Sequence, residues 1–452
     1  MSAGMRRARR RVPPGARGIA AAISVLGLGA LTLLLKPPGT LLLMLLAALL
    51  WPWPAEVDDV LRKAGLVPRL RRNLAIALLV FAIPVNLAAG GQLDGHLVYR
   101  GDFKTYYLGA FVGTAHGWNR LFDADVQRLM WDTMPGPRVP FLPFLNTPLQ
   151  AWLVTPLLPL GYVAAYVTWV GLMGLALLAL IALATASMPR LGWLCVALAA
   201  SLWVVAYTLA SGQNALLAAL SLALCWWFLR RRREGLAGAA LWLLIARPNA
   251  VFLVPLALLA AGFWRTFLTS LLGAAIAAAI FAVTLGQRGV HDFLALVPQV
   301  QSSHPLAHQM TLRQLLGTGL TTLLLQAVLG IAALAVARRV RGKPAPAILA
   351  GVAGSLLLTP YLHVQDYVTV LAALLLLTVE ALPAAASDVG PRAAANAAGY
   401  GRGRAWERAG LGGLVVVSLG LAPPGWIFGD LWEAPLALLE LGILGWLWRF
   451  RA

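Results

Sequence analysis

Charge, and negative charge above all, is scarce in this chain of 452 residues. Charged side chains make up 12% of the residues, and 17 Asp and Glu stand against 36 Lys and Arg. Hydrophobic residues make up 60% and gather in Leu- and Ala-rich runs of membrane length, with a mean hydropathy of +0.78. This composition excludes a soluble domain, and the unbroken runs exclude a transmembrane β-barrel, whose strands alternate in polarity. The sequence therefore predicts an all-α, polytopic transmembrane helix bundle.

Motifs for several kinds of soluble chemistry are also missing. There is no phosphate-cradling glycine loop, nucleophile elbow or HExxH sequence, so a nucleotide-fuelled reaction in the cytosol lacks its parts. Any activated substrate should therefore lie in the membrane. The histidines supply no convincing metal-ligand set, and neither a metal nor a cofactor is expected. The two cysteines, Cys195 and Cys225, lie in apolar runs as packed thiols.

The surplus of positive charge, formally +19, lies in short clusters between the apolar runs. That distribution argues against one basic face for nucleic acid and is typical of cytoplasmic loops, where Lys and Arg accumulate. With the basic loops inside, all six histidines and the polar, aromatic stretch 99–107 fall outside. We therefore expect a multi-pass protein of the inner (cytoplasmic) membrane with its polar chemistry on the extracytoplasmic side.

Four stretches depart from simple membrane spans. The longest, 91–145, has no apolar run of membrane length, and its acidic and aromatic side chains predict short interfacial helices in an extracytoplasmic first loop. Prolines predict broken or re-entrant elements at 146–160 and 236–262. A second outer loop is expected at 286–314.

Asp102 is the carboxylate in the stretch 99–107. Charge near the membrane is costly unless it has a task or a partner, and a carboxylate held there can act as a general base toward an incoming hydroxyl. The alternative is a loop aspartate that caps a helix beginning at Phe103. Spacing alone favours the cap.

Two polar breaks interrupt apolar runs further along the chain. Arg247 precedes Pro248, which frees backbone carbonyls, so the arginine either faces a polar cavity suited to a lipid phosphate or snorkels from a short helix end. Gln213 and Asn214 either bind sugar hydroxyls or form the cap of the helix that begins there. Both alternatives remain open at each break.

His363 and Asp366 lie three residues apart at the start of an apolar helix, and hence on neighbouring faces. They are suited to binding a phosphate or tuning a base, and equally to pairing with one another at the membrane interface. Their spacing is not a metal signature.

A series of short motifs runs in order between residues 74 and 382. They are Gly101-Asp102-Phe103 with Tyr106-Tyr107, Gly117 leading to Leu121-Phe122-Asp123, the stretch from Pro143 to Pro148, Trp169, Gly212-Gln213-Asn214, Arg247-Pro248, and Thr359-Pro360-Tyr361 with Asp366-Tyr367. In these motifs taken together the chain resembles glycosyltransferase family 87, which belongs to the integral-membrane GT-C glycosyltransferases. Thr147 stands where a second proline is common in the family, and Arg247 where lysine is frequent.

The resemblance implies an enzyme that moves a sugar, often mannose or another hexose, from a polyprenyl-phosphate donor to a hydroxyl of a glycolipid or glycan acceptor. Transfer would take place outside the cytoplasmic membrane, with inversion and without a metal or cofactor. Asp102 matches the family's acidic residue in the first outer loop and is expected to be the general base. Candidates for binding the donor phosphate are Arg247, His363, Lys104 and Arg313. Candidates for the sugar or the acceptor are Tyr107, Gln213, Asn214 and Asp366.

The resemblance also divides the chain into three parts. Residues 1–73 form a basic N-terminal segment with two accessory spans, 74–382 a GT-C type transmembrane catalytic module, and 383–452 a cytoplasmic linker with two C-terminal spans. A carrier for lipid-linked sugars or polyisoprenoids is the alternative function, because it too needs outer polar residues and broken helices. Such a carrier would move its substrate without making a bond.

Overall fold

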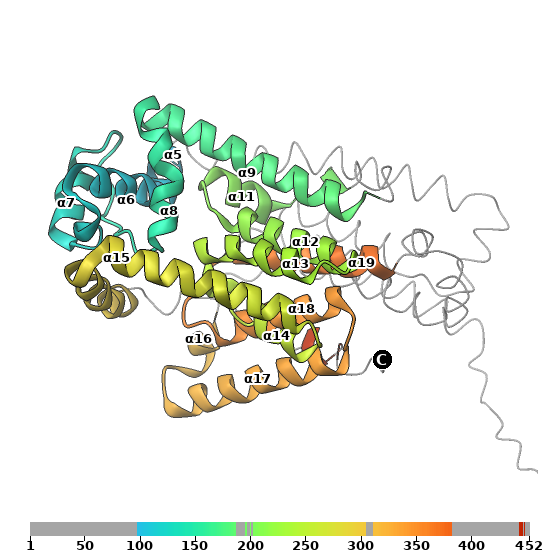
Figure 1. The fold of residues 1–452 in the computed structure, drawn as a ribbon. Helices are drawn as coiled ribbons and strands as arrows, with labels where there is room; N and C mark the ends of the chain where they lie inside the picture. The colour runs from blue at the N-terminus through green and yellow to red at the C-terminus, as the bar shows by residue number, and fades with distance from the viewer. Residues whose placement is uncertain are drawn as a thin grey trace, which may run out of the picture.

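The computed structural model describes residues 97–186, 195–196, 199, 202–303, 311–381, 443–445 and 447, and these residues form helices and connecting loops without a strand (Figure 1). The predicted all-helical class is therefore confirmed over this part of the chain. The expected spans before residue 97, the linker at 383–409 and most of the C-terminal spans lie outside the described residues, as does part of the span expected at 191–210. The three-part division of the chain stays a prediction.

Three helices are long and apolar enough to cross a membrane, and the number rises to five if each of two bent helix pairs is one span. The three are α9 (Tyr162–Ala184), α15 (Trp264–Ser303) and α17 (Leu320–Arg339). They carry many exposed leucines and valines on their outer faces. A protein with several such helices is a multi-pass membrane protein.

The centre of the bundle is α18 (Pro344–Leu358), whose residues up to Leu357 are all buried. A helix that is apolar on every side can be buried on every side. Two small residues let its neighbours approach: a Cβ on Gly351 would lie 2.7 Å from the Cα of Val254, and one on Gly354 would lie 2.7 Å from the Cβ of Ala333. Close packing at small residues is a usual means of helix association in membranes.

The first loop folds into a compact group of short helices at one end of the bundle, as predicted (Figure 1). Gln127 is buried within it and bonds the backbone of two segments, accepting from Phe144 N (2.7 Å) and donating to Leu121 O (2.8 Å). The stretch 146–160 forms two short helical pieces, as expected of a broken element. The elements of this group are α5 (Leu97–Arg100), α6 (Phe103–His116), η1 (Trp118–Arg120), α7 (Ala124–Thr133), α8 (Pro148–Val154) and η2 (Thr155–Leu160).

Both bent pairs turn by 119° at a polar break. In the first pair, α11 (Trp203–Ala210) gives way to α12 (Ala215–Arg230) across residues 211–214. In the second pair, the first arm is α13 (Glu234–Ala240) with η3 (Leu241–Ala246), and the second arm is η4 (Pro248–Ala250) with α14 (Val254–Ala260). Arg247 stands between the arms. The break predicted from Pro248 is thus confirmed.

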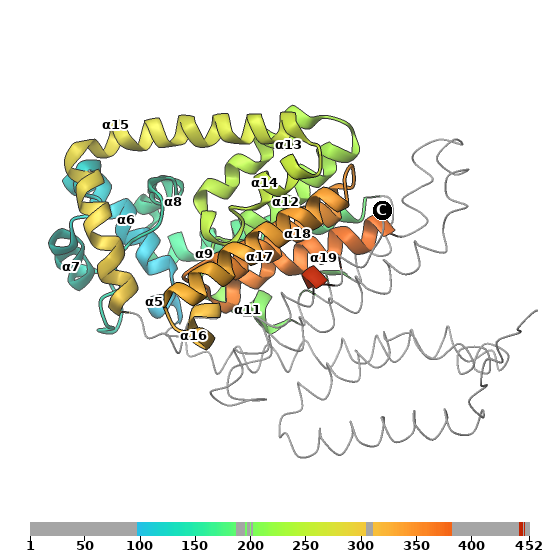
Figure 2. The same ribbon diagram turned by 90° about the horizontal axis from the view of Figure 1, so that it is seen from below.

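The prediction of a second outer loop at 286–314 is wrong over the first half of that range. There α15 continues to Ser303 beyond a single non-helical residue, Gly286, at φ 61°. In Figure 2 the helix bends, and its second part runs beside α6 and α7. A short helix, α16 (Leu312–Leu316), also lies within the expected loop, and the chain then returns through α17.

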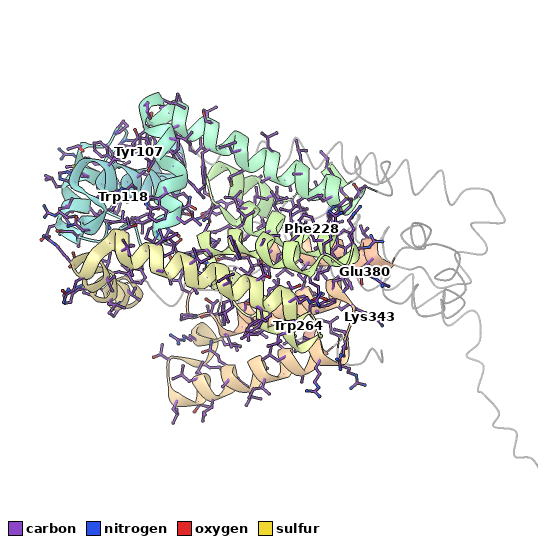
Figure 3. The ribbon with its side chains drawn as sticks, in the orientation of Figure 1. Tyr107, Trp118, Phe228, Trp264, Lys343 and Glu380 are labelled. Atoms are coloured by element: carbon purple, nitrogen blue, oxygen red, sulfur yellow. The ribbon has the colours of Figure 1, made fainter. Side chains whose placement is uncertain are left out.

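The two ends of the bundle differ in character. Figure 3 places Tyr107 and Trp118 with the first-loop helices at one end, and Phe228, Lys343 and Glu380 toward the other. The basic turns that follow α12 and α17 lie at this second end. Two further elements close the described fold, η6 (Val364–Tyr367) and α19 (Val368–Ala381).

Candidate active site

Asp102 is seated against the first polar break. It directly precedes α6 but makes no side-chain cap for that helix, so the capping alternative is not what the structure shows. Its Oδ2 instead accepts a hydrogen bond from Nε2 of Gln213. Next to it, Phe103 N donates to Ser211 O (3.1 Å). The first loop thereby presents its carboxylate to the bend between α11 and α12.

Gly212 makes this close approach possible. Its φ is +68°, and a Cβ there would lie 2.6 Å from the Cβ of Phe103. Both the backbone conformation and the lack of space require glycine. Trp169 fixes the turn further by donating from Nε1 to Gly212 O (2.8 Å).

Arg247 is the buried cation of the site and is 7% exposed. Its Nε donates to Asp366 Oδ1 at 2.5 Å, and its Nη1 donates to Gln213 Oε1 at 2.6 Å and to Asn214 Oδ1 at 3.1 Å. An arginine that snorkels toward solvent would not be held in this way, so the structure favours the cavity-facing alternative. Nη2 makes no hydrogen bond to a described residue.

Asp366 is the second carboxylate of the cluster and is completely buried. Oδ1 accepts from Arg247, while Oδ2 accepts from the backbone N of His363 at 3.0 Å. Both oxygens of Asp366 are thus bonded to protein groups. Oδ1 acts as the counter-ion that orients Arg247, and Oδ2 bonds the backbone N–H that precedes η6.

The amides at the first break are also occupied. Gln213 Oε1 accepts from the hydroxyl of Tyr106 (2.8 Å) as well as from Arg247. Asn214 Nδ2 donates to Gln150 Oε1 (2.7 Å) and to Ala246 O (3.0 Å), and its side chain does not cap α12. Asn214 therefore ties the two helix breaks together.

A cavity of about 320 Å³ lies where these segments meet. Its lining includes the predicted residues Asp102, Gln213, Arg247 and His363. Asn214 and Asp366 lie directly behind this wall. A volume of this size is at the lower end of the range of small-molecule pockets.

Burial and charge act on Asp102 together. Loss of hydration raises the pKa of its carboxyl to about 6, against the opposing effect of the Arg247 charge and with a further increase from the Asp366 charge. Near neutral pH the carboxylate is therefore mostly ionised and able to take up a proton. Burial also raises the pKa of Tyr106, which keeps its hydroxyl proton for Gln213.

Three predicted site residues lie away from the cavity lining. Lys104 points its Nζ at the Trp131 ring, 4.2 Å from the centroid, and burial lowers its pKa. Tyr107 packs on Tyr162, with ring centroids 5.2 Å apart. Arg313 lies in α16, where its Nε is buried without a hydrogen-bond partner among the described residues. Their roles in binding donor or sugar stay predictions.

Sequence reasoning missed Gln150 and gave no role to Tyr106. Tyr106 stands one turn after Asp102 and belongs to the same sequence motif, which could have indicated its role. Gln150 is separated by 64 residues from the asparagine that it contacts, and no sequence pattern indicates such a pairing. Within the described residues no group of three His, Cys, Asp or Glu side chains is arranged to hold a metal ion.

Residues 144–364 of the chain match Glycosyltransferase family 87. The matched stretch includes Gln213, Asn214, Arg247 and His363, whereas Asp102 precedes it. No curated protein and no solved structure matches the chain.

Proposed function

Because the chain carries a glycosyltransferase family 87 domain and is a membrane glycosyltransferase, we propose that it transfers a hexose from a polyprenyl-phosphate donor to an acceptor hydroxyl. The observation that carries this proposal is the cavity in which one carboxylate and one guanidinium face the same space across the Gln213 amide. The family assignment favours an enzyme over the carrier that the sequence left as an alternative.

Asp102 is the general base of the proposed reaction. Its Oδ1 has no hydrogen bond to a described residue, whereas both oxygens of Asp366 are bonded to protein groups. Asp102 takes the proton from the acceptor hydroxyl as that oxygen attacks the anomeric carbon of the donor sugar. The bond between this carbon and the phosphate oxygen breaks, and its electron pair leaves with the polyprenyl phosphate. A single displacement of this kind inverts the anomeric configuration.

Arg247 stabilises the phosphate as it leaves. Its remaining nitrogen, Nη2, is placed to donate a charge-assisted hydrogen bond, and His363, which also lines the cavity, is a second candidate donor. The guanidinium is already oriented by Asp366 and Gln213, so little rearrangement is needed when negative charge develops.

The proposed location is the extracytoplasmic side of the inner membrane. In support, the first-loop helices that hold Asp102 lie at the end of the bundle opposite the Lys343 turn (Figure 3). Basic turns are retained in the cytoplasm. A polyprenyl-phosphate sugar is an activated substrate available on the other side without a nucleotide. Mannose is the sugar proposed first, and the acceptor is a glycolipid or glycan.

The test is a transfer assay with the purified full-length protein in nanodiscs, polyprenyl-phosphate mannose labelled in the sugar, and a membrane lipid extract as acceptor. Labelled product that no longer carries the polyprenyl phosphate is the expected result. Asp102→Asn should lower this transfer by about 10²–10⁴-fold, the usual contribution of a general base. Full activity of a folded Asp102→Asn protein would overturn the base assignment, and a donor that remains intact with wild type would overturn the proposed function.

A further inference from the structure

Three amide side chains line the cavity without hydrogen bonds to any described residue: Asn146, Asn249 and Gln365. They contrast with Gln213 and Asn214, the amides predicted to bind sugar, whose groups are largely occupied by Asp102, Tyr106, Gln150, Ala246 and Arg247. The occupied amides build the wall of the site, and the three others are available to a ligand.

The three amides come from three separate elements that the fold brings to one cavity. Asn146 stands just before α8, and Asn249 lies in η4, directly after Arg247 and Pro248. Thr147 Oγ1 donates to Ile245 O at 2.9 Å, which holds the first two segments side by side. Gln365 lies in η6, between His363 and the fully buried Asp366.

None of the three has a visible structural task. The N-cap of α8 is Thr147 and not Asn146, and the N-cap of η4 is Arg247. Gln365 is 3% exposed, lines the cavity and makes no side-chain hydrogen bond to a described residue. Asn146 and Asn249 are half-buried, and an amide that lines a cavity without a described protein partner is available to bond a ligand.

We propose that Asn146, Asn249 and Gln365 form a binding site for the hydroxyl groups of a pyranose ring. Each amide offers an N–H donor and a carbonyl acceptor, and each sugar hydroxyl both donates and accepts, so the two kinds of group are matched. The cavity also presents the rings of Phe293 and Tyr361, against which the C–H face of a sugar ring can pack. This site rests on the proposed function, because it requires a sugar in this cavity.

The ring has two possible sources, the donor sugar and the sugar of a glycan acceptor. The amide chemistry is the same for both, and kinetics separate them. If the donor supplies the ring, alanine substitution of the amides raises the KM for the donor. If the acceptor supplies it, the same substitutions raise the KM for the acceptor and leave the KM for the donor unchanged.

The variants are Asn146→Ala, Asn249→Ala and Gln365→Ala, with Asn119→Ala as the matched control, since Asn119 is an exposed asparagine outside the cavity lining. Each cavity variant should raise one of the two KM values about three- to tenfold, the range for loss of one neutral hydrogen bond. Asn119→Ala should match wild type. Should a variant elute as aggregate, Asn→Ser and Gln→Ser at the same positions replace it.

Deoxy analogues test the same contacts without touching the fold. Polyprenyl-phosphate mannose lacking one ring hydroxyl at a time, and acceptors modified likewise, are assayed with wild type and with each variant. If an amide binds a given hydroxyl, the variant that lacks this amide should show no further increase in KM with the analogue that lacks this hydroxyl. Wild-type KM values for all three cavity variants, with each deoxy analogue impaired as much in the variants as in wild type, would overturn the site.

A direct binding measurement with tritiated polyprenyl-phosphate mannose distinguishes failure of the amide site from failure of the proposed transfer reaction. If wild type transfers label and Asp102→Asn does not, but the amide variants behave as wild type, only the amide site is wrong. If wild type binds the donor through these amides without transferring its sugar, the amide site stands and the transfer proposal fails. No binding and no transfer by wild type would overturn both.

Discussion

Partly or fully buried carboxylates occur at both ends of the bundle, and they are used differently. At the cavity end, Asp102 keeps one oxygen free of described protein partners and faces open space, while Asp366 holds Arg247 in place. At the other end, Glu380 Oε2 accepts from Trp226 Nε1 (2.7 Å) and from Ala345 N (3.3 Å). Glu380 thus joins α12 to α19 and satisfies a backbone N–H at the start of α18.

The difference teaches that burial of a charge does not by itself indicate chemistry. Glu380 is surrounded by the groups it serves, and its environment explains its presence as a link between helices. Asp102 is tied at one oxygen only, and that tie fixes its orientation toward a cavity shared with a cation. Substitutions at the two ends should therefore affect different properties.

The largest effect is expected from Arg247→Leu. Removal of the guanidinium leaves Asp366 buried without its partner, which costs about 3–5 kcal/mol of folding free energy, and it also removes the proposed phosphate ligand. Thermal unfolding in detergent should show an early transition, and transfer should fall below detection.

The double variant Arg247→Leu with Asp366→Asn separates these two losses. An asparagine is neutral and still accepts from His363 N, so most of the stability should return while transfer does not. Recovery of transfer together with stability would show that Arg247 serves the fold alone.

An intermediate effect is expected from Gln150→Leu. Gln150 is completely buried and positions the amide of Asn214, whose oxygen faces Arg247, so its loss should lower kcat about tenfold through misplacement of the cation. A purely structural role would lower the melting temperature with kcat unchanged. Gln150→Glu retains the accepting oxygen and should keep the larger share of kcat.

Glu380→Leu should give the smallest effect on activity. Two N–H donors lose their acceptor, so we expect a loss of about 1–3 kcal/mol in stability. Transfer measured well below the melting temperature should stay within about twofold of wild type. Glu380→Gln, which keeps an oxygen at this position, should regain part of the stability. A large loss of transfer in the folded Glu380→Leu protein would remove the functional contrast between the ends.

Much of this architecture is foreseeable from local chemistry. A proline after Arg247 in an apolar run predicted a break, and the chain does bend there by 119°. Polar residues between apolar runs likewise indicated the bend at Ser211–Asn214. These features were predictable because a missing backbone donor, or a polar amide within an apolar run, interrupts the helix at that position.

Other features depend on contacts that local chemistry does not specify. Gly286 and Pro298 resemble helix breakers, and α15 does bend at Gly286, yet the helix resumes beyond it and includes Pro298. Its second part packs on the first-loop segment, where the ring of Phe293 lies tilted against that of Phe122 with centroids 4.8 Å apart. Lys104 is two residues from Asp102, and residues so spaced on a helix do not share a face. Proximity in the sequence suggested a common site, whereas Lys104 directs its Nζ at the Trp131 ring, and its role at the donor stays a prediction.

The pH dependence of kcat/KM for the donor tests the role of Asp102 most directly. The base must be ionised to act, and the pKa of Asp102 is about 6. Activity should therefore be full at pH 7.5, fall by half near pH 6 and decrease tenfold for each further unit of acidification. The residual activity of Asp102→Asn should show no such acid limb. An acid limb near pH 4 in wild type, or the same limb near pH 6 in Asp102→Asn, would contradict the assignment of Asp102 as the base.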